Sequence, residues 1–249
     1  MSLTEEELER YARHIVLKEV GGAGQTRLKA ASVALVGVGG IGAPALQYLA
    51  AAGIGRLVLI DDDRVDLSNL QRQVVFGTGD VGRLKVDAGA DAGARLNPGA
   101  SCERRPLRLD ASNADALLGG TDVIVDGSDN FSTRLAVSDA SLRLRIPLVS
   151  AAVGQFEGQL AVYRGWEPDK PCYRCFVGFD PGRAEESCAE AGVLGAMVGV
   201  MGSLAALEAI RAITPFGDDP AGRLLLVDAL AMRFRTLALP KDPGCAGCS

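Results

Sequence analysis

Two CxxC pairs are the residues of this 249-residue chain whose spacing most directly indicates chemistry. Cys172 pairs with Cys175 in the middle of the chain, and Cys245 pairs with Cys248 at its end. Four thiolates in two such knuckles suit tetrahedral zinc, and a site without an open coordination position is structural. We therefore predict a structural zinc site that ties the C-terminal tail to the middle of the chain. A disulfide or a redox pair is the alternative.

The two remaining cysteines belong to neither pair. Cys188 lies in the segment 176–191, which is rich in Gly, Pro and charge and is expected to be a mobile loop. A thiol used for group transfer must be exposed and partly ionised, but Glu186 and Glu190 would raise the pKa of Cys188. Cys102 lies in a predicted strand and is interpreted as a small core residue.

A glycine-rich turn, GVGGIG at 37–42, follows an apolar run at 32–36 and precedes a helical pattern. Glycines let the backbone turn tightly and approach a phosphate at the positive N-terminus of a helix. Asp61 follows the second predicted strand, where a Rossmann acid would hold ribose hydroxyls. The pattern predicts a bound adenine nucleotide, although glycines that serve packing alone are the alternative. It does not distinguish ATP from NAD.

Further polar segments follow the strands and favour ATP. SNLQRQ at 68–73 comes after the acidic run 61–63, Lys85 comes shortly afterwards, and DGSDN occupies 126–130. Open α/β sheets bind ligands at the carboxyl ends of their strands, so these segments can converge on one crevice. Arg and Lys neutralise a triphosphate, and a carboxylate oxygen suits magnesium. A dehydrogenase needs none of these groups, although each residue alone could be a solvated surface charge.

These residues require a scaffold of alternating strands and helices from residue 32 onward, the pattern of βαβ units. The predicted strands are 32–36, 57–60, 101–105, 123–125 and 147–150, and the predicted helices are 43–52, 85–96, 114–118 and 132–144. Gly53 is expected to end the first of these helices. Strands at 159–163, 224–227 and 234–237 follow, and no crossover helix separates the last two. We predict an α/β fold with a Rossmann-like, doubly wound, mostly parallel sheet and a C-terminal antiparallel extension.

One domain should contain residues 1–249, because this length can bury a single core. We divide it into an N-terminal helical segment at 1–30, a nucleotide-binding half at 31–152 and a second half with the zinc site at 153–249. Thr4 and Glu7 have the spacing of a capping box. The short helix that starts there should carry Tyr11, Arg13 and His14.

Composition excludes several classes of partner. The net charge of −5 and the pI near 5.1 argue against a nucleic-acid binder, because such proteins place Lys and Arg against phosphates. Residues 1–13 lack the apolar core of a signal peptide. The apolar stretch 193–213 is interrupted by charged and polar residues, so it is interpreted as a buried helix, with a subunit interface as one role, rather than a membrane span. We expect a cytoplasmic protein.

Taken in order, the motifs GVGGIG, SNLQRQ, DGSDN, CYRC and PGCAGC resemble the MoeB/ThiF/HesA family of ubiquitin-activating-like enzymes. The likeness runs from RYARH at 10–14 to the final cysteine pair. It implies ATP-dependent adenylylation of the C-terminal carboxylate of a ubiquitin-like sulfur-carrier protein, with release of pyrophosphate. The enzyme would be a homodimer, and residues 153–249 of each chain would bind the carrier. A carboxylate is a nucleophile at neutral pH, so alignment and charge stabilisation suffice and one histidine is no obstacle.

The resemblance also implies individual roles. Asp61 would bind ribose, Asn69, Arg72 and Lys85 would contact phosphates, and Asp129 would hold magnesium beside Asn130. Arg13 would act as an arginine finger in the partner's ATP site, and Cys188 occupies the place of a loop cysteine that forms a covalent link with the carrier in some members. The residues expected to bind ATP are Gly37, Gly39, Gly40, Gly42, Asp61, Asp63, Ser68, Asn69, Leu70, Gln71, Arg72, Lys85, Asp129 and Asn130. Those expected to act in catalysis are Arg13, Arg72, Lys85, Asp129 and Cys188.

The carrier type stays open within this family. DAL at 228–230 and DPGC at 242–245 look more like MoeB, whereas GVLG at 192–195 and GVMG at 199–202 look closer to ThiF. We favour a MoaD-like carrier of molybdopterin synthesis over a ThiS-like carrier of thiamin synthesis. No rhodanese-like domain follows, so a separate protein should donate the sulfur. An NAD-dependent oxidoreductase and a noncatalytic carrier-binding scaffold are the remote alternatives.

Overall fold

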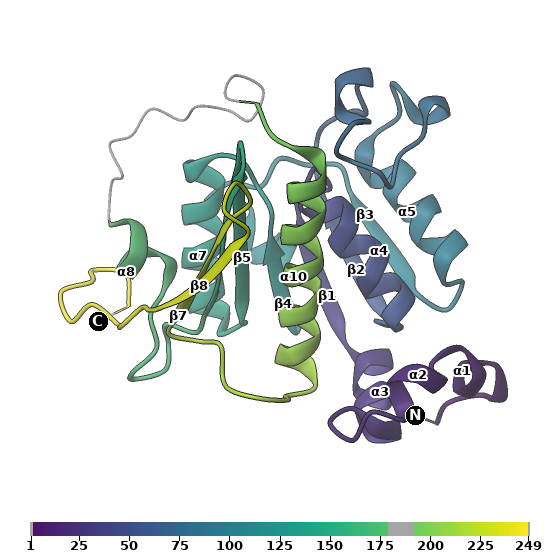
Figure 1. The fold of residues 1–249 in the computed structure, drawn as a ribbon, viewed down its shortest axis with the longest axis horizontal. Coiled ribbons are helices and arrows are strands. Elements are labelled where there is room, and N and C mark those ends of the chain that lie inside the picture. Colours follow the sequence, from purple (N-terminus) through teal and green to yellow (C-terminus); the bar gives the residue numbers. More distant parts are fainter. Residues whose placement is uncertain (1, 179–191, 249) are drawn as a thin grey trace.

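The computed structural model describes residues 2–178 and 192–248, which form one eight-stranded sheet with helices on both faces (Figure 1). The strand order is β3-β2-β1-β4-β5-β6-β7-β8. Strands β1 to β5 are parallel, and β6, β7 and β8 continue the sheet in antiparallel pairing. The predicted doubly wound sheet with an antiparallel extension is therefore confirmed.

The observed elements lie close to the predicted ranges. The strands are β1 (Ser32–Val36), β2 (Arg56–Ile60), β3 (Ser101–Arg105), β4 (Val123–Asp126), β5 (Leu148–Gly154), β6 (Glu157–Tyr163), β7 (Arg223–Asp228) and β8 (Arg233–Ala238). The helices are α1 (Glu5–Arg10), α2 (Ala12–Ile15), α3 (Gly21–Ala30), α4 (Gly42–Ala52), α5 (Lys85–Leu96), α6 (Ala114–Leu118), α7 (Phe131–Leu144), α8 (Tyr173–Val177) and α10 (Gly195–Ile213), with short 3-10 turns η1 (Leu67–Asn69) and η2 (Thr78–Asp80). Strands β5 and β6 run longer than predicted because they form one hairpin, closed where Gly154 pairs with Glu157.

The central strands are buried on both faces, as expected for a parallel sheet covered by helices. In β1, Val33 and Leu35 pack into the layer that contains α4, α5 and α10. Ala34 and Val36 pack into the opposite layer, with α6, α7 and α8. The side chains of β1 thus contribute to two cores, and this burial fixes the register of the sheet.

The N-terminal segment differs from the prediction at Tyr11. The capping box of Thr4 and Glu7 is present, but α1 ends at Arg10, and Arg13 and His14 lie on the separate helix α2. Tyr11 is buried, its hydroxyl accepts a hydrogen bond of 2.8 Å from Asn97 Nδ2, and its ring lies where a Cβ on Gly53 would point. Gly53 ends α4 with a φ of 86°, as predicted. The burial of Tyr11 against α4 is what separates the two short helices.

The apolar stretch 193–213 becomes helix α10, which starts at Gly195 and packs against α4 and strands β4, β5 and β6. Its length and composition would allow it to cross a membrane. The close approach of Gly202 to Pro44 and to the carbonyl oxygen of Ile41 instead places it in the core layer. Its outer face carries the half-exposed side chains of Val200 and Leu207.

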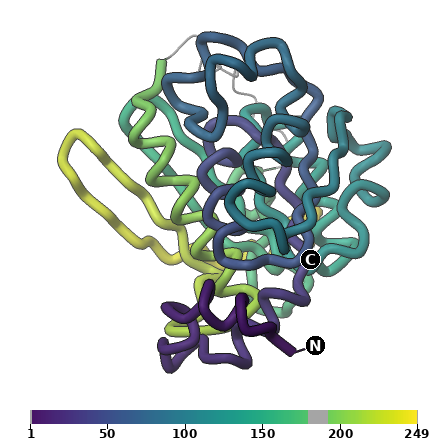
Figure 2. Tube along the Cα trace, turned by 90° about the vertical axis from the view of Figure 1, so that its right-hand side faces the viewer, coloured from purple at the N-terminus to yellow at the C-terminus, as the bar shows by residue number. Residues whose placement is uncertain are grey.

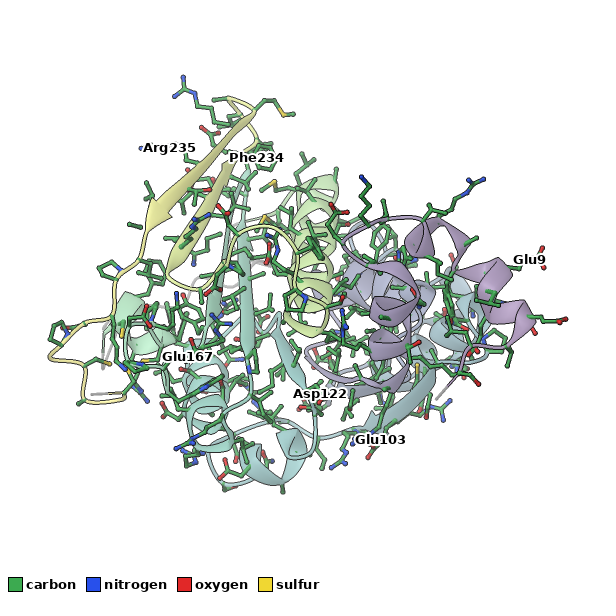
Figure 3. All side chains as sticks on the ribbon, turned by 90° about the horizontal axis from the view of Figure 1, so that it is seen from below. Glu9, Glu103, Asp122, Glu167, Phe234 and Arg235 are labelled. Carbon is green, nitrogen blue, oxygen red and sulfur yellow. The ribbon has the colours of Figure 1, made fainter. Side chains whose placement is uncertain are left out.

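The β7–β8 hairpin projects past helix α10 on one side of the molecule (Figure 2). Every residue of β8 is exposed, including Phe234 and Arg235, which lie at the margin of the molecule in Figure 3. The predicted loop 176–191 is wrong at its start, because Phe176 and Val177 belong to α8, where the Phe176 ring lies 6.5 Å from that of Tyr173. Residues 179–191 lie outside the described part of the chain.

Candidate nucleotide site

The glycine-rich turn connects β1 to α4 in a conformation that requires glycine. Gly37 has a φ of 82°, and a Cβ on Gly42 would lie 1.9 Å from the carbonyl oxygen of Gly37. The turn is also held from outside, because the Val38 backbone N–H donates to Asp61 Oδ2 at 2.7 Å. Asp61, the acid predicted to bind ribose, therefore also holds the glycine turn in place.

The Asp61 carboxylate lies in a partly buried position after β2. Its other oxygen accepts from the Asp63 backbone N–H at 2.8 Å. Burial raises the pKa of Asp61, and the nearby Lys85 charge and these backbone hydrogen bonds offset part of that rise. Each carboxylate oxygen can accept a second hydrogen bond, so Asp61 keeps acceptor capacity for a ligand hydroxyl.

Two cations and an amide face the same region. Lys85, the first residue of α5, is buried, and its Nζ donates to Asp63 Oδ2 at 2.9 Å. Arg72 donates to the Ser68 carbonyl oxygen at 2.9 Å, which directs its side chain back along its own turn. Asn69 accepts from the Asp66 backbone N–H at 3.1 Å and so helps to fold the turn that presents Arg72.

The DGSDN segment follows β4 on the other side of the glycine turn. Asp126 is fully buried, and its Oδ1 accepts from the Ser128 backbone N–H at 3.0 Å and from the Ser128 hydroxyl at 2.6 Å. Asn130 caps α7 by accepting from the Thr133 N–H at 2.9 Å. Asp129, the residue before Asn130, is exposed, so its carboxylate is accessible from the pocket. The segment thus folds around buried polar contacts and presents one carboxylate.

These segments meet in one pocket of about 510 Å³ at the carboxyl ends of the parallel strands. Such a volume lies within the range of small-molecule sites. The pocket lies where the strand order reverses between β1 and β4, which is the expected ligand crevice of a doubly wound sheet. Of the residues predicted from sequence, it is lined by Gly37, Gly39, Gly40, Asp61, Asp63, Asn69, Arg72, Lys85, Asp129 and Asn130.

Four residues of the predicted nucleotide set lie outside the lining. Gly42 is packed against Gly37 and begins α4, so its role is structural. Leu70 packs against the core, Ser68 is exposed, and the carbonyl of Gln71 lies where a Cβ on Gly195 would point. Side chains of a tight turn point in different directions, so one motif supplies both ligand-facing and packing residues.

The sequence reasoning missed four buried polar residues of the pocket, which are Gln73, Ser128, Thr133 and Arg134. Gln73 is 3% exposed, and its Oε1 has no hydrogen-bond partner among the described residues. Arg134 is buried and donates to the Ser128 and Ala151 carbonyl oxygens, the latter at 3.2 Å. Gln73 was visible as the last letter of SNLQRQ, but an arginine within the helical pattern of α7 gave no signal of its own.

Two predicted catalytic residues are not placed in the pocket. Arg13 is exposed on α2, within the N-terminal helices that lead through α3 into the start of β1. This is the end of the sheet opposite the pocket. Arg13 could therefore serve a nucleotide site only in another copy of the chain. Cys188 lies outside the described residues, and Cys102 is half-buried against Gly93 of α5, where burial raises its pKa.

The four cysteines of the CxxC pairs converge as predicted. The Sγ atom of Cys172 lies 3.8 Å from that of Cys175 and 3.6 Å from that of Cys245, and the Sγ atoms of Cys175 and Cys248 are 3.5 Å apart. Zn–S bonds of about 2.3 Å in a tetrahedron place the sulfur atoms about 3.8 Å apart. The cluster can hold a metal ion with all four positions filled by protein.

A glycine turn, an acid at the second strand, two cations and an exposed carboxylate around one pocket are the features of a nucleotide-binding α/β protein. The ThiF family model matches residues 11–247. The chain belongs to the ThiF family, as the motifs indicated.

Individual relatives match this chain over nearly its full length. The sulfur carrier protein adenylyltransferase of Thermus thermophilus is 47% identical, covering 100% of this chain and 93% of that protein. The SAMP-activating enzyme E1 of Haloferax volcanii is 45% identical over 100% of this chain and 91% of that protein. The molybdopterin-synthase adenylyltransferase of Salmonella typhimurium is 39% identical over 99% and 98%. Among solved structures, E. coli MccB bound to MccA-N7isoASN matches with a TM-score of 0.85 at 24% identity, over 96% of this chain and 75% of that one, which establishes a shared fold.

Proposed function

We propose that this chain is an ATP-dependent adenylyltransferase that acts on the C-terminal carboxylate of a ubiquitin-like sulfur-carrier protein. One observation carries the proposal: Asn69, Arg72, Lys85 and Asp129, which come from separate segments, line the same pocket as the glycine turn. The names of the full-length relatives support the reaction class.

In the proposed reaction, a carboxylate oxygen of the carrier attacks the α-phosphorus of ATP and the bond to the β-phosphate oxygen breaks. The products are an acyl-adenylate and pyrophosphate. Asp61 would position the ribose, and Lys85 and Arg72 would stabilise the charge that moves onto the leaving pyrophosphate. No base is needed because the nucleophile is already ionised. The chain's task is to align the two substrates and to balance their charge.

Two metal ions are part of the proposal. Asp129 is exposed at the pocket and offers the hard oxygen that magnesium prefers. Magnesium would supply positive charge at the triphosphate. Zinc would occupy the cluster of Cys172, Cys175, Cys245 and Cys248, where the spacing of the sulfur atoms suits it and leaves no site for substrate. Its role would then be to join the C-terminal tail to α8.

We further propose a homodimer, with Arg13 supplied to the ATP site of the partner. The position of Arg13 at the opposite end of the sheet from its own pocket supports a role in trans. We favour a MoaD-like carrier over a ThiS-like carrier, with sulfur donated by a separate protein in the cytoplasm. The molybdopterin-synthase relative supports that choice.

The proposal is tested by incubating the protein with ATP, magnesium and each type of carrier, and then measuring the mass of the carrier for added adenylate. Asp129→Ala should reduce carrier-dependent ATP–pyrophosphate exchange by about two orders of magnitude or more, in the range of lost electrostatic groups at active sites, while the fold stays intact. Asp115→Ala is the matched control, because Asp115 lies on α6 in an exposed ion pair with Arg143. Full exchange activity in Asp129→Ala would contradict the magnesium role.

A further inference from the structure

Tyr173 lies between the cysteine cluster and the pocket. It directly follows Cys172, begins α8 and is 3% exposed. Its side chain lines the large pocket and also an adjoining cavity of about 10 Å³. A residue inside the metal-binding knuckle therefore forms part of the pocket wall.

The surroundings of Tyr173 hold its ring in place. The Tyr163 ring of β6 packs edge-on against it, with centroids 5.7 Å apart and an interplanar angle of 83°. The next residue, Arg174, donates to both oxygens of Asp139 on α7, at 2.8 and 2.7 Å. Cys172 and Cys175 bracket these two residues within the cluster. The direction of the ring thus depends on the geometry of the knuckle.

The Tyr173 wall lies at the end of the pocket away from Asp61. The lining residues there include Arg134 of α7, Ala152 of β5 and Gln159 of β6, whereas Asp61 follows β2. Four strand intervals separate β2 from β6, or about 19 Å at the usual spacing. A nucleotide fixed at the glycine turn and Asp61 leaves this end for the second substrate. A small residue, an amide and a ring suit an extended peptide with small side chains.

We infer that Tyr173 is a positioning residue through which the cysteine-bound metal sets the end of the pocket that receives the C-terminal residues of the carrier. The inference rests on the proposed function. The metal holds Cys172 and Cys175, these residues hold the first turn of α8, and that turn holds the ring. Weakening the metal site should therefore impair carrier binding and leave nucleotide binding unchanged.

A double-mutant cycle tests this coupling. Tyr173→Ala and Cys248→Ser should each raise the KM for the carrier about tenfold, the size expected for one lost aromatic contact, with little change in kcat or in the Kd for ATP. The double variant should be no worse than either single variant, because both changes release the same wall. Zinc content should stay at one per chain in Tyr173→Ala.

Val177→Ala is the matched control, because Val177 lies on the same helix but lines neither the pocket nor the small cavity. Independent effects of Tyr173→Ala and Cys248→Ser on KM, or an equal rise in KM for Val177→Ala, would overturn the inference.

A second readout needs no catalysis. The chain has four tyrosines, so 3-fluorotyrosine labelling gives four fluorine resonances that Tyr→Phe variants can assign. Cys248→Ser should move the resonance of Tyr173 and leave that of Tyr48, which is exposed on α4. An unmoved Tyr173 resonance overturns the coupling. If the Tyr173 resonance moves in Cys248→Ser as expected but the wild-type chain makes no acyl-adenylate, the proposed function is wrong and the coupling between metal site and ring still holds.

Discussion

Gly42→Ala perturbs the glycine turn at its tightest contact. A Cβ at position 42 would lie 1.9 Å from the Gly37 carbonyl oxygen and 2.9 Å from its carbonyl carbon. Ordinary van der Waals contact begins near 3.4 Å. The start of α4 and the turn must therefore separate by about 1.5 Å, and both partners in this contact are parts of the backbone, which cannot move aside as a flexible side chain can.

The expected cost follows from what the movement breaks. The hydrogen bond from Val38 N–H to Asp61 Oδ2 is 2.7 Å long and does not survive a shift of this size. Overpacking costs about 1–3 kcal/mol, and a lost hydrogen bond to a charged group costs about 1.5–3 kcal/mol. Because the two effects overlap, we expect the free energy of unfolding to fall by about 3 kcal/mol. The affinity for ATP should fall at least about tenfold, since the turn forms one side of the pocket.

Urea unfolding and equilibrium dialysis with ATP measure the two quantities. Gly22→Ala is the control, because Gly22 lies in α3 and a Cβ there meets no atom of the described chain within 4 Å. Alanine should raise stability at that helical position by about 0.5–1 kcal/mol. The same Gly→Ala change is thus expected to lower the free energy of unfolding at position 42 and to raise it at position 22. A Gly42→Ala protein as stable as the wild type, with unchanged ATP affinity, would refute the steric reasoning.

Three further predictions concern the ends of the chain. Arg13→Ala should be inactive alone but partly active in isolated mixed dimers with an Asp129→Ala subunit, because one of the two ATP sites then keeps all its residues. ATP–pyrophosphate exchange measures this activity, and mixed dimers that remain inactive would refute the role of Arg13 in trans. The hydrogen bond from Lys29 and the capping box with Thr4 lower the pKa of Glu7. Their stabilisation is therefore present at neutral pH and is lost as the pH falls through the lowered pKa. In urea unfolding, Glu7→Gln should then be less stable than the wild type at pH 7, and the difference in stability should shrink toward about pH 3. A difference in stability that grows in acid would contradict the lowered pKa of Glu7. Metal removal should increase hydrogen exchange in α8 and residues 242–248 more than in β1 and α4, and equal increases in both regions would show that the metal stabilises the whole fold rather than the tail.

The sequence alone determined the scaffold and ten of the residues that line the pocket. Strands such as β1 and helices such as α5 could be predicted because their hydrophobic pattern and the residues that end them are local features of the sequence. The glycine turn and Asp61 could be placed because the βαβ unit fixes their separation along the chain. The cysteine pairs could be matched because metal ligands have a characteristic spacing.

The tertiary structure alone decided which residues of each motif face the pocket. Leu70 and Gln71 stand beside Arg72 in sequence, yet the turn directs the first two to packing contacts and the third to the pocket. Arg134 and Tyr173 became visible as pocket residues once α7 and α8 were placed on the sheet. The physical reason is that side-chain direction and burial depend on contacts between segments far apart in the chain, which local patterns do not encode.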